Sequence, residues 1–318
     1  MIRFILPMFL ASTTAVAQDA EPAPVAVSGV IFSSFGVDFT DAPTSAFDVD
    51  RVYLTYKKKI GDDFGIRVTT DAGRTTEDDG KQRLFVKYAY AEWKNAIPGT
   101  TLRFGAAGMP FPGYYDKFWG HRYVSMAFTD ANKLLRTSDF GMHALGKTSN
   151  GLFDWQVSLV NGEGYGVEEP DADKAVVARA TIDPLRGGDA GRLPITLTVF
   201  QDVLTDNPRT LYGAATGFSN ANTTAWVEYV GTLQADVTGT GLSATLLQGI
   251  GPVNILARYD FLDEDTGTTD DAETTLIAGL SGAVEKGIEL ALTFEQTVSE
   301  ADTDNPEQGV FLRTQAKF

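Results

Sequence analysis

The chain has 318 residues, and its 26 lysines and arginines against 42 aspartates and glutamates give a formal net charge of −16. An acidic chain repels phosphate backbones, so nucleic-acid binding through counterion release loses its electrostatic driving force. Aromatic residues make up 11% of the chain, which argues against disorder, and the absence of cysteine excludes disulfides, thiolate metal sites and cysteine nucleophiles.

Residues 1–17 have the parts of a secretory signal peptide. Arg3 supplies the positive start, residues 4–10 are apolar, and the small residues at 15–17 form a cleavage site. The apolar run is far shorter than the roughly 20 residues of a membrane-spanning helix, which favours cleavage over an anchor. Cleavage would leave residues 18–24 as a short periplasmic segment.

The remainder of the chain, residues 25–318, is predicted to form a single domain of alternating strands. In 253–261 the odd positions are apolar, in 288–295 the even ones are, and 310–318 repeats the pattern. A period of two with one apolar face indicates antiparallel sheet whose apolar face is covered. In a soluble sandwich a second sheet covers that face, whereas in a membrane barrel lipid does.

Strand length and connections favour the membrane barrel. Strands of around ten residues match the roughly 9–11 that a tilted transmembrane strand needs. Short connections alternate with long acidic ones, and the last residue is the aromatic Phe318. The long acidic connections are 71–80, 162–173, 263–273 and 299–307. We therefore predict an all-β fold, a transmembrane antiparallel β-barrel with no cofactor and no metal site.

Sixteen strands can be traced if the chain is required to alternate in direction. They span residues 25–40, 46–57, 64–73, 84–94, 101–110, 140–148, 152–161, 174–183, 194–202, 209–218, 223–236, 241–248, 253–262, 273–284, 287–298 and 309–318. The segments 209–218 and 223–236 alternate least, so fourteen strands with one longer loop is the alternative. A barrel of sixteen strands leaves a water-filled lumen.

The connection at residues 111–139 lacks alternation and is rich in aromatic residues. Such apolar density does not suit a freely solvated loop. Folding into the barrel would bury the aromatic rings and narrow the lumen, whereas an outer lid or a subunit contact is the alternative. A short helix is expected within 124–135. The candidate charged residues of this constriction loop are Lys117, His121 and Arg122.

Charged residues of the predicted strands fall on two walls of the lumen. By alternation the candidate pore-lining basic residues are Arg51, Arg67, Lys87, Arg103, His143 and Lys147. The candidate acidic residues of the opposite wall are Asp260, Glu289 and Glu295. Facing walls of opposite charge would set up a transverse field that orients dipolar solutes and separates ions by sign. The alternative is that each residue is an ordinary solvated side chain with a local partner.

Four short motifs lie in one block of the chain. They are Glu92-Trp93, Pro110-Phe111 before the long loop, Asp139 with Gly141, and Asn161-Gly162. In this order the sequence resembles the phosphate-selective porin O and P family of Gram-negative outer membranes. The resemblance implies a sixteen-stranded homotrimeric channel that passes small solutes.

One stretch departs from that family. Its members commonly carry a polar and then a basic residue just before the Pro-Phe pair, whereas this chain has Ala106-Ala107-Gly108-Met109. Because dedicated anion capture needs several aimed donors, we expect the architecture of the family without its phosphate specificity.

The predicted function is passive diffusion of small polar solutes or ions through a porin of a Gram-negative outer membrane, in contact with membrane lipid and lipopolysaccharide. Two alternatives differ in class. An outer-membrane hydrolase would need a base or a ligand set, but only His121 and His143 are present, without a nucleophile motif. A surface anchor or adhesin barrel would need large folded outer loops. We therefore expect no enzyme activity.

Overall fold

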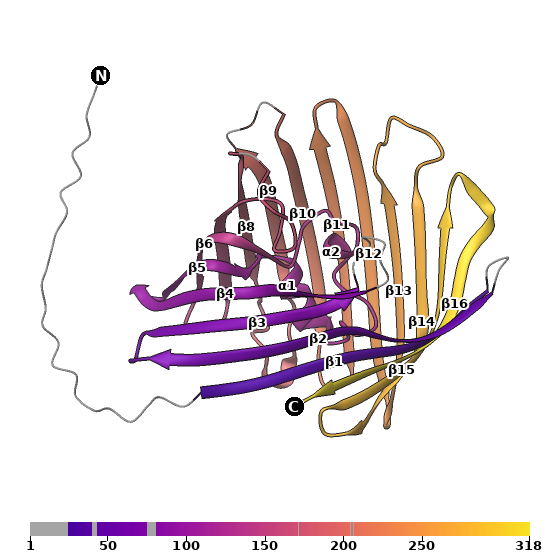
Figure 1. Cartoon of the computed structure of the whole chain (residues 1–318), viewed down its shortest axis with the longest axis horizontal. Helices are drawn as coiled ribbons and strands as arrows, with labels where there is room; N and C mark the ends of the chain where they lie inside the picture. Colours follow the sequence, from indigo (N-terminus) through magenta and orange to yellow (C-terminus); the bar gives the residue numbers. More distant parts are fainter. Residues whose placement is uncertain (1–24, 40–42, 75–80, 171, 204, 206) are drawn as a thin grey trace, which may run out of the picture.

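A computed structural model describes residues 25–39, 43–74, 81–170, 172–203, 205 and 207–318 of the chain. Within these residues sixteen antiparallel strands form one closed barrel, in which β1 pairs with β16 and every other pair is consecutive in the chain (Figure 1). The predicted signal peptide and the segment 18–24 lie outside the described residues. No helix in the described part of the chain has the length and apolar character to cross a membrane.

The strands are connected by two α-helices and one 3₁₀ turn as well as by loops. Their bounds are β1 Val25–Asp38, β2 Thr44–Ile60, β3 Phe64–Arg74, β4 Gln82–Ile97, β5 Thr100–Gly108, α1 Pro112–Trp119, α2 Phe128–Ala131, β6 Ser138–Lys147, β7 Phe153–Val160, β8 Lys174–Ile182, η1 Gly188–Ala190, β9 Ile195–Val203, β10 Arg209–Ser219, β11 Thr223–Gln234, β12 Val237–Ile250, β13 Val253–Asp263, β14 Glu273–Glu285, β15 Ile288–Ser299 and β16 Asp302–Lys317. We call the end where β1 begins and β16 ends the near end, and the other end the far end.

The sixteen-strand prediction is confirmed, and the fourteen-strand alternative is wrong. The two weak segments are β10 and β11, and apart from Glu228 their buried inner side chains are apolar, namely Leu211, Ala215, Trp226 and Val230. The alternation of apolar and polar residues is lost there because the long loop inside the barrel covers this part of the wall with its own aromatic side chains.

The predicted acidic loop at 299–307 is wrong. β15 ends at Ser299 and β16 begins at Asp302, so only a two-residue turn separates them, and Thr297 still pairs with Glu307. Both faces of this hairpin are largely exposed at the far end. Backbone pairing therefore continues where neither face needs an apolar cover, and the sequence pattern there resembles a solvated loop.

Apolar side chains cover the outer surface of the barrel. Phe104 is 70% exposed, Leu197 62% and Leu292 53%, and they alternate along their strands with inward residues. A soluble monomer rarely leaves so extended an apolar surface in water. Every strand of the closed barrel is hydrogen-bonded to a neighbour on each side, so the wall has no open sheet edge, as a lipid environment requires.

The loop between β5 and β6, residues 109–137, folds into the barrel and lies against the inner face of the strands that follow β7 (Figure 1). Inward folding of the long loop is confirmed, with bounds two residues earlier than predicted. The short helix expected in 124–135 is α2, whereas α1 was not predicted. The buried core of the protein is this loop and the wall behind it.

Candidate channel and constriction loop

One aromatic cluster fastens α1 to β11. The ring of Trp226 lies 6.2 Å from Phe111, 5.8 Å from Tyr115 and 5.1 Å from Phe118, measured between ring centroids. Gly217 on the wall leaves space for these rings because it has no side chain. A Cβ at this position would lie only 2.8 Å from the Phe118 ring. Trp226 is itself only 1% exposed, so this contact excludes water and holds the loop on one side of the lumen.

Buried arginines hold the rest of the loop. Arg258 on β13 donates from Nη1 to the carbonyl oxygen of Met126, and its Nε donates to Asp260 at 2.8 Å. Arg179 on β8 donates to the carbonyl oxygen of Pro110 at 2.8 Å and forms an ion pair with Asp154. The carbonyl groups of a loop accept hydrogen bonds readily from a guanidinium, so these two arginines fix its path. Sequence analysis missed both, although Arg179 interrupts a face of small and apolar residues and Arg258 lies two residues before the predicted Asp260.

His121 fastens the loop to β14. Its Nε2 lies 3.0 Å from the hydroxyl oxygen of Ser281, and its ring stacks on Tyr123 with 5.6 Å between centroids. His121 is buried, and burial lowers its pKa. This predicted constriction residue therefore binds the wall and does not face the opening.

Acidification should loosen this attachment. Burial favours neutral His121, whereas a detached loop would expose the imidazole and restore a pKa near the ordinary value of about 6.5. The attached state is therefore fully favoured above about pH 7 and loses stability as the pH falls below that value. The nearby charge of Glu289 raises the pKa of His121 and so opposes this effect, whereas the charge of Lys317 lowers that pKa and adds to it. We expect current noise of single channels to rise between pH 7 and pH 5, and His121→Asn to lose that dependence. The same pH response in the variant would contradict the assignment.

Asp71 joins two of the predicted pore-lining cations. This carboxylate is fully buried on β3 and accepts a hydrogen bond from the hydroxyl of Tyr165 at 2.7 Å. Arg51 Nη1 lies 3.3 Å from its Oδ1, and Lys87 Nζ lies 3.8 Å from its Oδ2. Lys87 is 4% exposed and also lies 4.8 Å from the centre of the Tyr53 ring. Lys87 is thus a buried, paired cation, in line with the alternative of a local partner, and its pore-lining role remains a prediction.

Removing the Asp71 charge should have two effects. In Asp71→Asn, Arg51 and the buried Lys87 keep their charges without a carboxylate, and we expect the free energy of unfolding to fall by about 3–5 kcal/mol. The freed positive charge should also increase anion preference. Unfolding midpoints and reversal potentials measure the two effects.

Asp48→Asn is the matched control for Asp71→Asn. Asp48 pairs with Arg74 at 2.7 Å, but both side chains are partly exposed. Such an exposed pair contributes little to stability, because solvent screens the two charges. Equal destabilisation by the two variants would contradict a special role for Asp71.

A basic chamber lies at the near end, below the loop. We use this name for the cavity of about 490 Å³ that Lys57, Arg67, Arg103 and Lys117 line. In the described part of the chain its lining holds seven lysines and arginines and one acid, Glu92, which pairs with Arg103 at 2.8 Å. The positive surplus is large, so the chamber attracts anions.

Lys117 brings the loop into the basic chamber. It lies at the end of α1, and its pKa is lowered, first by burial and then by the charges of Arg103, Arg67, Arg179 and Lys57. Arg67 donates from Nε to the Thr69 hydroxyl at 3.0 Å and stacks on Tyr88. These cations therefore belong to one electrostatic cluster, formed by β2, β3, β5 and the loop.

The architecture can be compared with known proteins at this point. No family model matches the chain, and no match was found among curated proteins. Solved structures do match. OprB of Pseudomonas putida aligns with a TM-score of 0.71 at 9% identity, over 92% of this chain and 94% of that one. An anion-selective porin from Comamonas acidovorans aligns with a TM-score of 0.68 at 10% identity, over 93% of this chain and 100% of that one.

The fold is that of outer-membrane porins. A third structure, a trimer form of in-vitro folded OmpT from Vibrio cholerae, aligns with a TM-score of 0.65 at 9% identity, over 94% of this chain and 100% of that one. At these identities the likeness concerns the fold. None of the three is described as phosphate-selective, so the finer resemblance to the porin O and P family stays a prediction.

Within this porin fold the predicted acidic wall is mostly compensated. Asp260 is paired with Arg258, and Glu295 binds Arg313, whose Nη2 donates to Oε2 at 3.0 Å. Glu289 forms no ion pair with any residue that the structure describes and lies near His121. The field between two opposed walls is therefore weaker than predicted, because alternation shows which way a side chain faces but not which partner it meets.

The remaining predicted residues fall outside the basic chamber. His143 is 2% exposed, and its Nδ1 lies 2.9 Å from the hydroxyl oxygen of Ser158. Lys147 is exposed where β6 ends at the near end. Arg122 stays in the loop and pairs with Asp116 and Asp130. The pore-lining role of the predicted residues remains a prediction.

Proposed function

We propose that the protein is an outer-membrane porin through which small hydrophilic solutes and ions diffuse passively, with anions preferred. The observation that carries this proposal is the loop 109–137, fastened to one side of the lumen, with the basic chamber beside it. A solute that passes the loop meets Lys57, Arg67 and Lys117, none of which forms an ion pair within the described residues. Diffusion needs no bond making, so charge and width alone discriminate.

The proposal includes the setting of the channel. The near end faces the periplasm, the outer apolar face contacts membrane lipid, and the acidic far end meets lipopolysaccharide. We also propose a homotrimer, which the trimer form of the OmpT structure supports by analogy of fold.

Two alternatives receive less support. A hydrolase built on His143 and Ser158 would need both groups to reach a substrate, but Ser158 is 1% exposed and His143 2%. An adhesin or anchor would need folded outer domains, whereas the turn between β11 and β12 holds two residues, and so does the turn between β15 and β16.

Currents through the refolded protein in a planar bilayer test the proposal. We expect stable ohmic steps and, in a salt gradient, a reversal potential of the sign that anion preference produces. Well-folded protein without steps would overturn the porin proposal. Steps with cation preference would retain the channel and overturn the role of the basic chamber.

A further inference from the structure

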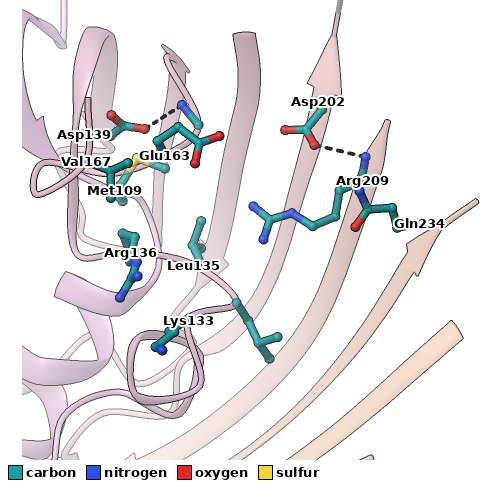
Figure 2. A pocket seen from close by; sticks show the side chains of 12 residues that line it. Met109, Lys133, Leu135, Arg136, Asp139, Glu163, Val167, Asp202, Arg209 and Gln234 are labelled. Carbon is teal, nitrogen blue, oxygen red and sulfur yellow. Dashed lines mark hydrogen bonds between the residues drawn. The ribbon is translucent and has the colours of Figure 1, made fainter. Parts of the chain in front are cut away.

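A second cavity lies at the far end, separate from the basic chamber. Its volume is about 290 Å³, which exceeds the space of a single water many times over and suits a small organic solute. The loop 109–137, the segment after β7 and the far ends of β9, β10 and β11 surround it (Figure 2). We call it the outer pocket.

The lining of the outer pocket is balanced in charge, unlike that of the chamber. It holds three basic residues, Lys133, Arg136 and Arg209, and three acidic ones, Asp139, Glu163 and Asp202. A solute with one sign of charge therefore meets both attraction and repulsion there. A solute that carries both signs can satisfy both.

Two of the acidic groups already have backbone partners. Asp139 accepts hydrogen bonds from the backbone N–H groups of Phe140 at 2.7 Å and Gly162 at 2.8 Å. Asp202 accepts one from the backbone N–H of Arg209 at 3.0 Å. Figure 2 shows the bonds of Gly162 and Arg209 to these carboxylates as dashed lines at the pocket rim. Because these two carboxylates are already hydrogen-bonded to the backbone, they form part of the pocket wall and are less available to a ligand.

The other four charged side chains of the pocket have no such hydrogen-bond partner. Among the residues that the structure describes, the side chains of Lys133, Arg136, Arg209 and Glu163 form no hydrogen bond or ion pair. Arg209 only stacks on Phe200, with 4.4 Å from its guanidinium carbon to the ring centre. In Figure 2 the Glu163 carboxylate and the Arg209 guanidinium reach into the same space from two sides. They line one cavity without pairing, so the space between them is open to a ligand.

We propose that the outer pocket binds an acidic amino acid, a solute with two carboxylates and one ammonium group. The cations Arg136, Arg209 and Lys133 would receive the carboxylates, and a guanidinium can bind a carboxylate through two parallel hydrogen bonds. Glu163 would receive the ammonium group. This assignment rests on the proposed passage of solutes and names a solute class for it, since the net negative charge of such a solute also suits the basic chamber.

Binding of L-glutamate and glutarate to the refolded mature chain in detergent micelles tests the assignment. Glutarate has the same two carboxylates and lacks the ammonium group. Saturation-transfer NMR titrations should show L-glutamate binding about fivefold more tightly, the size of one partly exposed ion pair. Equal affinity for the two solutes, or no saturable L-glutamate binding, would overturn the assignment.

Variants locate the site. Glu163→Gln should remove the preference for L-glutamate without weakening the binding of glutarate, which then meets one repulsive charge fewer, and Arg209→Gln should weaken the binding of both solutes. Glu168→Gln is the matched control, because Glu168 is exposed in the same segment and does not line the pocket. A preference that survives Glu163→Gln would place binding elsewhere and overturn the proposal.

The same preparations separate this inference from the porin proposal. Ohmic steps in potassium chloride report the channel without any amino acid. Ohmic steps in a protein that does not bind L-glutamate would overturn only the assignment of the outer pocket. Binding without steps supports the pocket and overturns passive diffusion.

Discussion

Reversing two charges of the basic chamber, in Arg67→Glu with Lys117→Glu, should turn the channel from anion to cation preference. The two reversals change the local charge by about four elementary units in a confined, partly buried space where screening is weak. Neither side chain forms an ion pair among the described residues, and Arg67 donates one hydrogen bond to Thr69 and stacks on Tyr88. The loss of packing should therefore be small, and the reversal potential in a salt gradient should change sign.

Arg51 and Arg103, which the sequence alone would select for this test, are poorer choices. Each already pairs with a carboxylate, Asp71 and Glu92, so a glutamate at either position would meet a like charge. Lys147→Glu serves as the control, since Lys147 lies at the exposed end of β6 and does not line the chamber. A reversal potential that moves equally in the control and in the double variant would show that general surface charge governs selectivity.

Truncating the anchor of the loop, in Trp226→Ala, should strongly lower the stability of the protein. The ring is 1% exposed and contacts Phe111, Tyr115 and Phe118. Large-to-small changes at such positions cost about 3–5 kcal/mol. The change also removes the donor that binds Glu228 at 2.7 Å, so a carboxylate stays buried without it. The loop should detach from the wall, and the steady current should become noisy and change in amplitude.

Trp93→Ala provides the comparison for Trp226→Ala. Trp93 lies on the outer face, 46% exposed, and stacks on Phe64 with 5.4 Å between centroids. Its loss should leave the conductance unchanged and affect unfolding less. Unfolding midpoints from lipid vesicles and single-channel traces measure both quantities. A Trp226→Ala channel with wild-type amplitude and noise would mean that this cluster does not hold the constriction.

The positive charge of this chain lies away from the place where the family resemblance would look for it. Gly108 and Met109 occupy the stretch before the Pro-Phe pair, and neither is charged. The cations gather instead near the turns of the near end, on β2, β3 and β5, and on α1 of the loop. The departure from the phosphate-selective pattern is thus consistent with a different arrangement of charge in the same fold.

The period of two in the sequence determined the barrel. A residue that follows its neighbour on a strand must face the other side, so apolar positions such as Leu290 and Leu292 fix the outer face, and the residues between them fix the inner one. The number of strands follows from that pattern and from the requirement that the strands alternate in direction and be even in number. The aromatic density of residues 111–128 likewise predicted burial of the long loop, because rings in that number cannot stay solvated at low cost.

Only the tertiary structure decided which groups the charged side chains of the lumen pair with. Asp71 reads as the start of an acidic loop, yet the register of β3 with β2 and β4 sets it beside Arg51 and Lys87. Arg258 binds Asp260 on its own strand, and its other bond goes to Met126, far away in the sequence. Such pairings depend on strand register and on the path of the loop, which are set by long-range packing. Alternation therefore assigns a charge to the lumen, but whether that charge is free or neutralised is decided by the assembled barrel.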